Sequence, residues 1–544
     1  MTEQFSGSTS LIEQDPVTFE VVRNALYAIC SEMKSVIMRT SFSPLLSLSA
    51  DLSCALLDSR GNVIAQGVDI PVHLGAARFT ALAVLKLFPA DTWQPGDGVL
   101  TNDPYSGGTH LPDMSLMTPV FDSDTLTGFA LSRIHWPDVG GSARGSSSVS
   151  DEIIKEGLRI PPVRIIEAGN LRQDILSMIL ANVRVPSDRR GDFHAALAGH
   201  TRAEERTSDL SMRFGGDVVR SVMRESQIYS HRLTAERLRA LPDADVSHCE
   251  ALDGDGVDPV ARPRIAVRIT KTGDRLKFDF TGSDPCAKGP VNASLPVTSS
   301  AVFYTVLAFI GGDIAPNSGV YEGVEIVAPE GTIINAAYPA PVVAANTETA
   351  NRLVDILMAA LAQAYPEKVA GGACGSACVY TLGGYDPERH RFFVHYETIG
   401  GGMGATRGAD GTSGLRVHMG NTMNLPIEAM EASLPVRFHA YQIVEESRGD
   451  GAMRGGGGVR KTVEMLADGV EASVLGERTI SPAHGVSGGG TGGLARFTLH
   501  GADGIERTLP AKSGPHRLDK GDTLEMVTAG GGGWGQPQKI GDNE

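Results

Sequence analysis

The chain is too long to fold around a single hydrophobic core. A core stops growing at roughly 250–300 residues, and longer chains divide into separate packed units. This chain has 544 residues, so we expect two to four such units. Hydrophobic residues make up 41% of the sequence and charged residues 21%, proportions that are typical of folded globular proteins and not of disordered ones.

The net charge excludes some classes of partner. It is -16 at pH 7, with an isoelectric point of about 5.4, so we expect no binding to nucleic acids or to anionic membrane surfaces, which carry charge of the same sign. Residues 1–14 show no basic region followed by an apolar run. No stretch of about 18 apolar residues occurs either. We therefore predict a cytoplasmic protein whose partners are small molecules and other proteins.

Four segments have clear secondary-structure patterns. Residues 15–39 combine a capping aspartate, a first-turn proline and apolar residues at helical spacing, which predicts an amphipathic helix. Residues 49–67 and 264–282 alternate apolar and polar residues around a turn, and each predicts a β-hairpin. Residues 203–243 combine high charge density with helical spacing and predict a long exposed helical region.

Two apolar segments at residues 98–102 and 126–135 predict strands, and the polar, glycine-rich residues beyond them are where we expect chemistry. The fold class expected is mixed α+β, a multi-lobed body with several β-sheets and flanking helices. The predicted division is an N-terminal lobe with the metal-site motifs (1–200), a helical connecting region (201–260), a strand-rich middle lobe (261–390) and a glycine-rich C-terminal lobe (391–544).

The most informative stretch ends with His110 and Asp113, because an imidazole and a carboxylate three positions apart can bind one divalent ion. His135, at the end of the second apolar segment, is a third candidate ligand, and Asp51, in the first hairpin, is a fourth. The six cysteines show no C-x-x-C spacing, so a thiolate zinc site is not expected. The nitrogen and oxygen donors suit Zn, Mn or Fe(II) in a catalytic site that activates water or polarises a carbonyl.

The same residues also fit a site without a metal. In that alternative His110 and His135 are hydrogen-bonded loop histidines, and Asp113 caps a helix. Asp103 and Asp138 likewise have two interpretations. They either orient the imidazoles as hydrogen-bond acceptors or begin turns.

Two further motifs leave their role open. Glu397 precedes the glycine-rich loop 400–404 and is either an acid/base group or, as we prefer, a satisfied hydrogen-bond acceptor. Residues 346–349 have the pattern of a helix start, which either serves as a cap alone or receives a phosphate or carboxylate. We assign no catalytic acid or base from the sequence.

The usual motifs for nucleotide phosphates are missing. The pattern G-x-x-x-x-G-K-[ST] is absent from the sequence. Residues 488–493 match G-x-G-x-x-G, but the strand, helix and later acidic residue of a dinucleotide site do not surround them. If the reaction uses ATP, its phosphate loop is expected in another chain.

On these motifs the chain resembles the hydantoinase B/oxoprolinase family, and within it the N-methylhydantoinase B-like subunits. The family also contains the larger subunits of acetone and acetophenone carboxylases. The resemblance covers nearly the whole chain, and its motifs occur in the family's order. They are residues 15–17, 102–113, 135–141, 156–162, 346–349, 396–404, 454–458 and 530–535.

The resemblance implies a metal and an obligate partner. In the carboxylases of the family the ion is held by a histidine, an aspartate three residues on, and a second histidine 25 positions after the first. His110, Asp113 and His135 keep this spacing, since 135 − 110 = 25, and the family's upstream aspartate falls on Asp51. The implied partner is a hydantoinase A-like subunit that binds ATP and phosphorylates the substrate, in an assembly of A2B2 type.

These inferences leave three hypotheses for the function. The first is ATP-dependent hydrolysis of a cyclic amide such as a hydantoin or 5-oxoproline, in which phosphorylation turns the amide oxygen into a leaving group. The second keeps the same site in a ketone carboxylase that joins an activated ketone to bicarbonate-derived CO2. The third is a structural subunit whose partner holds all the chemistry.

Overall fold

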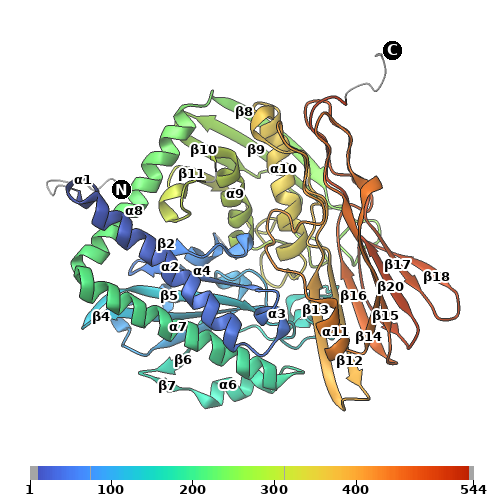
Figure 1. Cartoon of the computed structure of the whole chain (residues 1–544), viewed down its shortest axis with the longest axis horizontal. Coiled ribbons are helices and arrows are strands. Elements are labelled where there is room, and N and C mark those ends of the chain that lie inside the picture. Colours follow the sequence, from blue (N-terminus) through green and yellow to red (C-terminus); the bar gives the residue numbers. More distant parts are fainter. Residues whose placement is uncertain (1–9, 74, 312, 538–544) are drawn as a thin grey trace.

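The computed structural model of the chain describes residues 10–73, 75–311 and 313–537. Within them the fold is mixed α and β, as predicted, with four β-sheets and flanking helices (Figure 1). The cytoplasmic location was predicted in part from residues 1–14. Residues 1–9 of this segment lie outside the described residues. No helix among the described residues combines the length and the apolar character needed to cross a membrane.

A seven-stranded sheet with the order β2-β1-β5-β4-β3-β6-β7 organises the N-terminal part. Its strands are β1 (Leu52–Asp58), β2 (Val63–Gln66), β3 (Gly98–Thr101), β4 (Asp113–Asp122), β5 (Thr125–His135), β6 (Val163–Glu167) and β7 (Asn170–Leu171). The predicted hairpin is β1–β2, and the two predicted strands are β3 and β5. Strand β4 was not predicted, because it is buried on both faces and so lacks alternation, and because Pro119 is unusual in a central strand.

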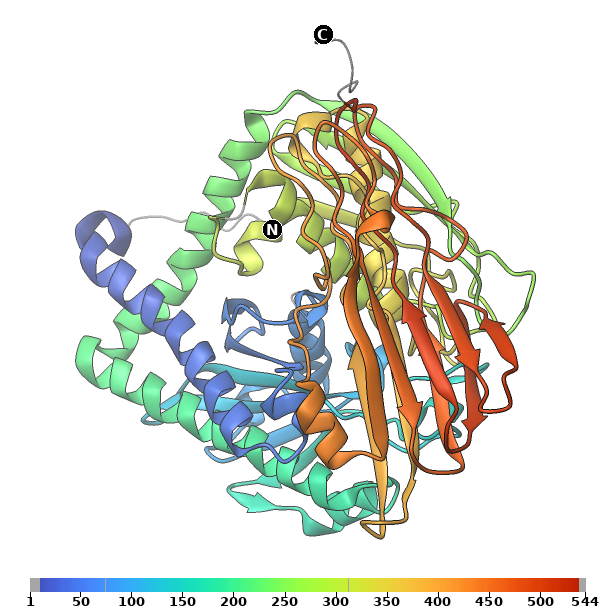
Figure 2. The same cartoon turned by 45° about the vertical axis from the view of Figure 1, so that its right-hand side comes forward.

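Helices α2 (Pro16–Thr40) and α7 (Pro186–Phe214) lie side by side across one face of this sheet (Figures 1 and 2). The predicted first helix is confirmed as α2, and the Asp15 side chain accepts a hydrogen bond from the Thr18 N–H. The predicted long helical region is two helices, since Gly215 ends α7 with a left-handed φ of 91° and α8 (Gly216–Arg239) follows. The shorter helices of this part are α1 (Leu11–Gln14), α3 (Pro44–Ser47), α4 (Ala76–Leu87), α5 (Ile153–Glu156) and α6 (Gln173–Leu180).

A four-stranded sheet with the order β11-β10-β9-β8 packs against α9 and α10 in the middle of the chain. The elements are β8 (Ala244–Ala251), β9 (Arg264–Thr272), β10 (Arg275–Asp279), α9 (Leu295–Ile310), β11 (Val324–Val327) and α10 (Ala350–Ala362). The second predicted hairpin is confirmed as β9–β10. Helical structure in the range 201–260 ends at Arg239, because residues 244–251 form an edge strand that pairs with β9.

The C-terminal part contains two sheets that enclose a common hydrophobic core, with the strand orders β13-β12-β16-β19 and β14-β15-β20-β17-β18. Figure 1 shows them side by side at the right of the molecule. The elements are β12 (Val379–Asp386), β13 (Arg391–Thr398), α11 (Ile427–Ser433), β14 (Val436–Val444), β15 (Gly458–Met465), β16 (Val470–Leu475), β17 (Arg496–His500), β18 (Glu506–Leu509), β19 (Lys512–Leu518) and β20 (Thr523–Val527).

Candidate metal centre

Three neighbouring strands of the N-terminal sheet present polar residues at the same end and on the same face. His135 ends β5 and pairs with Asp113, which begins β4. Asp51 directly precedes β1, and its carbonyl accepts a hydrogen bond of 3.1 Å from the His135 N–H. Successive side chains of a strand point to opposite faces. Because Ile134 and Met114 pack into the core beneath α2 and α7, the three polar side chains point to the other face.

The loop before β4 brings His110 to this same face. Its turn requires a glycine at position 107, where φ is 89° and a Cβ would lie 2.5 Å from the carbonyl oxygen of Phe79. The Asn102 side chain ties the loop together by donating to the carbonyl of Leu111 at 2.8 Å. The histidine therefore approaches the cluster from a fixed loop.

His110, Asp113 and His135 form one buried cluster. His110 Nε2 and His135 Nδ1 lie 3.2 and 3.3 Å from Asp113 Oδ1, and one ligand atom from each residue lies within 4.8 Å of the others. His110 Nδ1 lies 3.2 Å from the carbonyl oxygen of Val343, which can only accept a hydrogen bond. Nδ1 therefore carries the proton, and a neutral ring leaves Nε2 as a free ligand.

Two further side chains complete the cluster, and the sequence analysis assigned neither of them to it. His73 Nε2 lies 3.1 Å from Asp113 Oδ2, and Asn346 Nδ2 lies 3.2 Å from His110 Nε2. Residues 345–349 do begin a helix, as their pattern predicted, since they form a π-helical turn that continues as α10. The Asn346 side chain, however, faces His110 and Asp113, and its Oδ1 accepts no hydrogen bond from the described residues. His73 lies in none of the motifs that contain the candidate ligands, and no local sequence pattern distinguishes it.

The charges within the cluster shift its pKa values. Burial by itself would raise the pKa of Asp113, but the neighbouring His110 and His73 hold it well below its usual range. Burial would lower the pKa of His110, and the Asp113 carboxylate more than offsets this, so that the pKa is raised. Burial dominates at Asp51 and raises its pKa. A cation bound at the cluster would compete with the proton on His110.

Open polar atoms show that these residues fit a divalent ion. His135 Nε2 and Asn346 Oδ1 are buried and have no hydrogen-bond partner in the described part of the chain, although buried polar atoms are nearly always satisfied. Imidazole nitrogens and carboxylate oxygens are the donors that Zn, Mn and Fe(II) accept. Asp51 Oδ2 lies 4.0 Å from His135 Nδ1, next to the group of three and outside it.

Other candidates from the sequence lie away from the cluster. Asp103 caps a 3-10 turn by accepting from the Tyr105 N–H, and Asp138 pairs with Arg184 at 2.6 Å. Neither contacts an imidazole in the described part of the chain. Glu397 is buried, and both its oxygens lie 2.6–2.7 Å from Lys461 Nζ. It is thus a satisfied acceptor, as preferred from the sequence.

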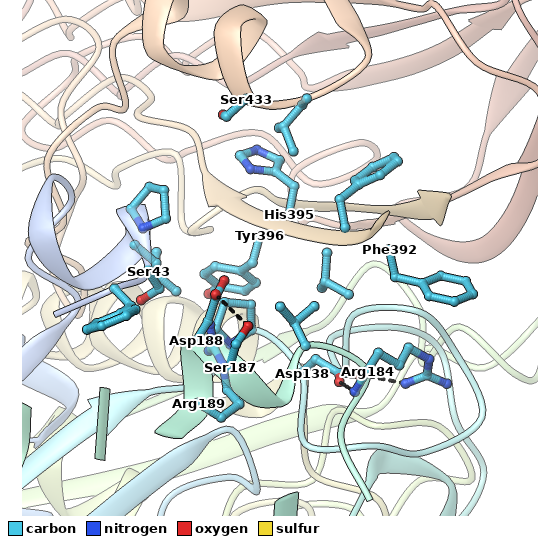
Figure 3. A pocket seen from close by; sticks show the side chains of 18 of the residues that line it. Ser43, Asp138, Arg184, Ser187, Asp188, Arg189, Phe392, His395, Tyr396 and Ser433 are labelled. Carbon is cyan, nitrogen blue, oxygen red and sulfur yellow. Dashed lines mark hydrogen bonds and ion pairs between the residues drawn. The ribbon is translucent and has the colours of Figure 1, made fainter. Parts of the chain in front are cut away.

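Two cavities meet at Tyr396 on β13. A small cavity of about 40 Å³ borders the cluster and is lined in part by Asp51, His73 and His135. A larger one of about 540 Å³ lies between β13, which contributes Phe392, His395 and Tyr396, and the segment 184–189 (Figure 3). Tyr396 lines both, and its ring centroid is 4.3 Å from that of His135. The tyrosine is therefore the wall between the larger cavity and the cluster.

Known proteins resemble this chain over almost its full length. The family model described as hydantoinase B/oxoprolinase matches residues 15–537. The B subunit of a putative D-/L-hydantoinase from Pseudomonas sp. (strain NS671) is 30% identical, over 97% of this chain and 91% of that protein. The beta subunit of the caprolactamase from Pseudomonas jessenii is 31% identical, over 96% of this chain and 91% of that protein.

Two solved structures share the fold. The crystal structure of ATP-dependent caprolactamase from Pseudomonas jessenii has a TM-score of 0.88 and 29% identity, over 96% of this chain and 91% of that chain. A nucleotide-free structure of acetone carboxylase also has a TM-score of 0.88, over 97% of this chain and 76% of that chain. At 18% identity, the second likeness shows the fold alone.

Proposed function

The chain belongs to the hydantoinase B/oxoprolinase family, and we propose that it is the metal-carrying subunit of an ATP-dependent enzyme that hydrolyses a cyclic amide. The observation that carries this proposal is the buried cluster of His110, Asp113 and His135. Relatives named as a hydantoinase and a caprolactamase support the substrate class. The substrate would be a lactam or hydantoin, as the names of those relatives indicate.

His110, Asp113 and His135 would hold the ion, with Asp51 as the nearest further oxygen donor. A divalent ion bound there supplies polarisation of a substrate oxygen and a more acidic water. Other residues of the chain orient these ligands. The Val343 carbonyl contacts His110, and His73 and Thr109 contact the second oxygen of Asp113. Such supporting contacts set ligand orientation in metal sites.

ATP would enter the reaction through a second subunit. This chain contains no G-x-x-x-x-G-K-[ST] motif, and two relatives are named as subunits. The partner would be a hydantoinase A-like subunit, in an A2B2-type assembly. An amide carbon is a poor electrophile because the nitrogen lone pair is delocalised onto the oxygen. Phosphorylation of the amide oxygen by the partner weakens this resonance and makes the carbon more electrophilic.

The remaining chemistry needs two waters and a proton donor. Water adds to the carbon that bears the phosphorylated oxygen, the ring C–N bond breaks, and the nitrogen takes a proton. The acyl phosphate that remains is hydrolysed by a second water to a carboxylate and inorganic phosphate. Tyr396 lines both cavities, and its Oη forms no hydrogen bond in the described part of the chain. Its hydroxyl is therefore free to donate a proton to the departing nitrogen.

Cavity volumes indicate where the substrate would lie. A volume of about 40 Å³ beside the cluster is too small for the ring of the substrate, because a single water molecule already needs roughly 10–15 Å³ by this measure. Cavities of about 540 and 420 Å³ adjoin it, one at Tyr396 and one at His73. The ring of the substrate would occupy one of these larger cavities, with its amide turned toward the cluster.

The experiment that tests the proposal combines this chain with a hydantoinase A-like subunit, ATP and a panel of lactams and hydantoins. We expect one ring-opened product for each ADP formed, and none when ATP or this chain is omitted. Incorporation of bicarbonate into a ketone, with no ring opened, would instead establish the carboxylase hypothesis. Ring opening by the partner alone would establish a structural role.

A further inference from the structure

Arg416 lines the small cavity beside the metal cluster, together with Asp51 and His135. Its guanidinium contacts neutral oxygens only. Nε lies 2.6 and 2.8 Å from the hydroxyls of Thr398 and Thr422. Nη1 donates to the Asn424 side chain at 2.8 Å, and Nη2 donates to the Thr398 carbonyl. Arg416 thus borders the reaction site as a cation without a carboxylate partner among the described residues.

The hydrogen-bonding capacity of Arg416 is not exhausted. A guanidinium has five N–H donors, and these contacts use one each on Nε, Nη1 and Nη2. The Tyr441 hydroxyl is a further hydrogen-bond partner of Arg416, so one N–H on the terminal nitrogens remains. It can donate a charge-assisted hydrogen bond to a phosphate or carboxylate oxygen.

A second arginine near the cluster also lacks an ion pair among the described residues, but it lines the cavity of about 420 Å³ at His73 and not the small cavity beside the cluster. Arg133 on β5 donates to the hydroxyls of Ser115 and Thr80, and it is 1% exposed. Arg416 is only partly buried and forms part of a cavity wall. Of these two cations, Arg416 is therefore the one that borders the small cavity beside the cluster.

We propose that Arg416 binds the phosphoryl group of the activated substrate in the cavity beside the metal cluster. This inference rests on the proposed function, in which the phosphoryl group is joined through one oxygen to the carbon that water attacks. A group so close to that carbon must lie next to the metal ligands. Asn346 and Thr347, at the start of the helix that continues as α10, line the same cavity, and a helix N-terminus favours negative charge.

The assignment fits both hydrolytic steps. The phosphoryl group stays on the substrate oxygen while the C–N bond breaks, and it leaves as inorganic phosphate when the second water hydrolyses the acyl phosphate. A fixed cation at that position stabilises the charge of the group throughout. Inorganic phosphate, as the product, then binds at the same place, which makes the site measurable without turnover.

The test measures the binding of inorganic phosphate to the purified chain by isothermal titration and by ³¹P line broadening. The variants are Arg416→Gln, which removes the charge, and Arg416→Lys, which keeps it without the planar guanidinium. The matched control is Arg78→Gln. Arg78 donates to the Asn62 side chain and, like Arg416, forms no ion pair among the described residues. Metal content and melting temperature are recorded for every variant.

We expect the Kd for phosphate to rise roughly 10- to 100-fold in Arg416→Gln, less in Arg416→Lys, and not at all in Arg78→Gln, with metal content unchanged. Phosphate binding of wild-type strength in Arg416→Gln, or no binding in the wild type, would overturn the proposal. Displacement of phosphate by an equal concentration of acetate would assign Arg416 to a substrate carboxylate and overturn it as well. A wild type that binds phosphate but holds no metal would contradict the proposed function and leave this site standing.

Discussion

Glu156 supports the candidate metal centre indirectly, through the backbone segment that contains Val343. Its side chain is 2% exposed and accepts hydrogen bonds from the Val342 and Val343 N–H groups at 2.9 and 3.0 Å. The Val343 carbonyl in turn fixes His110. The change Glu156→Ala leaves two buried N–H groups without an acceptor, and since each costs roughly 1–3 kcal/mol, the free energy of unfolding should fall by about 2–6 kcal/mol.

The same change should weaken metal binding. Without Glu156 the segment that carries the Val343 carbonyl is no longer held against His110, and loss of such a supporting contact typically lowers metal affinity roughly 10- to 100-fold. The assays are denaturant unfolding of the metal-free chain and competitive titration with a chelator. An alanine variant with wild-type stability and wild-type metal affinity would refute this reasoning.

Glu156→Gln is the matched control, because its amide oxygen can accept both backbone N–H groups. Burial raises the pKa of Glu156 from 4.5 to about 7. The folded chain therefore binds this proton more tightly than the unfolded chain, and the wild type should lose stability as the pH rises from about 4.5 through about 7. Glutamine does not titrate, so the unfolding midpoint of Glu156→Gln should vary less over this range. An equal pH dependence in both proteins would contradict the assignment.

Three further results are expected. Lys461→Met leaves the Glu397 carboxylate buried without its cation and should cost about 3–5 kcal/mol of stability in denaturant unfolding. Burial alone would raise the pKa of Glu397, but Lys461 lowers it to about 2, so the stability from this pair is present above about pH 4.5 and is lost as the pH falls through about 2. Tyr396→Phe should keep its metal, by elemental analysis, and should slow lactam turnover roughly 100-fold or more, whereas wild-type turnover would exclude the tyrosine as proton donor. Gly107→Ala should lower both metal content and melting temperature, because its Cβ meets the carbonyl of Phe79.

The sequence predicted those parts of the fold that local patterns encode. The helix from Pro16 and the hairpins β1–β2 and β9–β10 carry caps, turns and periodicity within one short segment, and all three were found. Strand β4 was missed because burial on both faces removes alternation and Pro119 argues against a central strand. The early start of α7 at Pro186 was missed because glycines and charged residues dilute its apolar face.

The candidate site likewise contains residues that local patterns predict and residues that only the packing of the fold brings in. His110 and Asp113 lie three positions apart, and His135 ends a recognisable strand, so these patterns make the three residues candidates, and the resemblance to the family implies that they act together. His73 and Asn346 reach the cluster only through the packing of distant segments. The short distance between Asp51 and His135 is likewise set by the register of β1 and β5, which no single-sequence pattern specifies.

The central claim is that His110, Asp113 and His135 bind a metal on which catalysis depends. Elemental analysis of the purified chain tests it most directly, with the wild type beside His110→Ala and His135→Ala and with ATP-dependent lactam hydrolysis measured after the partner subunit is added. The account predicts about one transition-metal ion per wild-type chain, lost from both variants together with activity. A metal-free wild type that is fully active with its partner would contradict it.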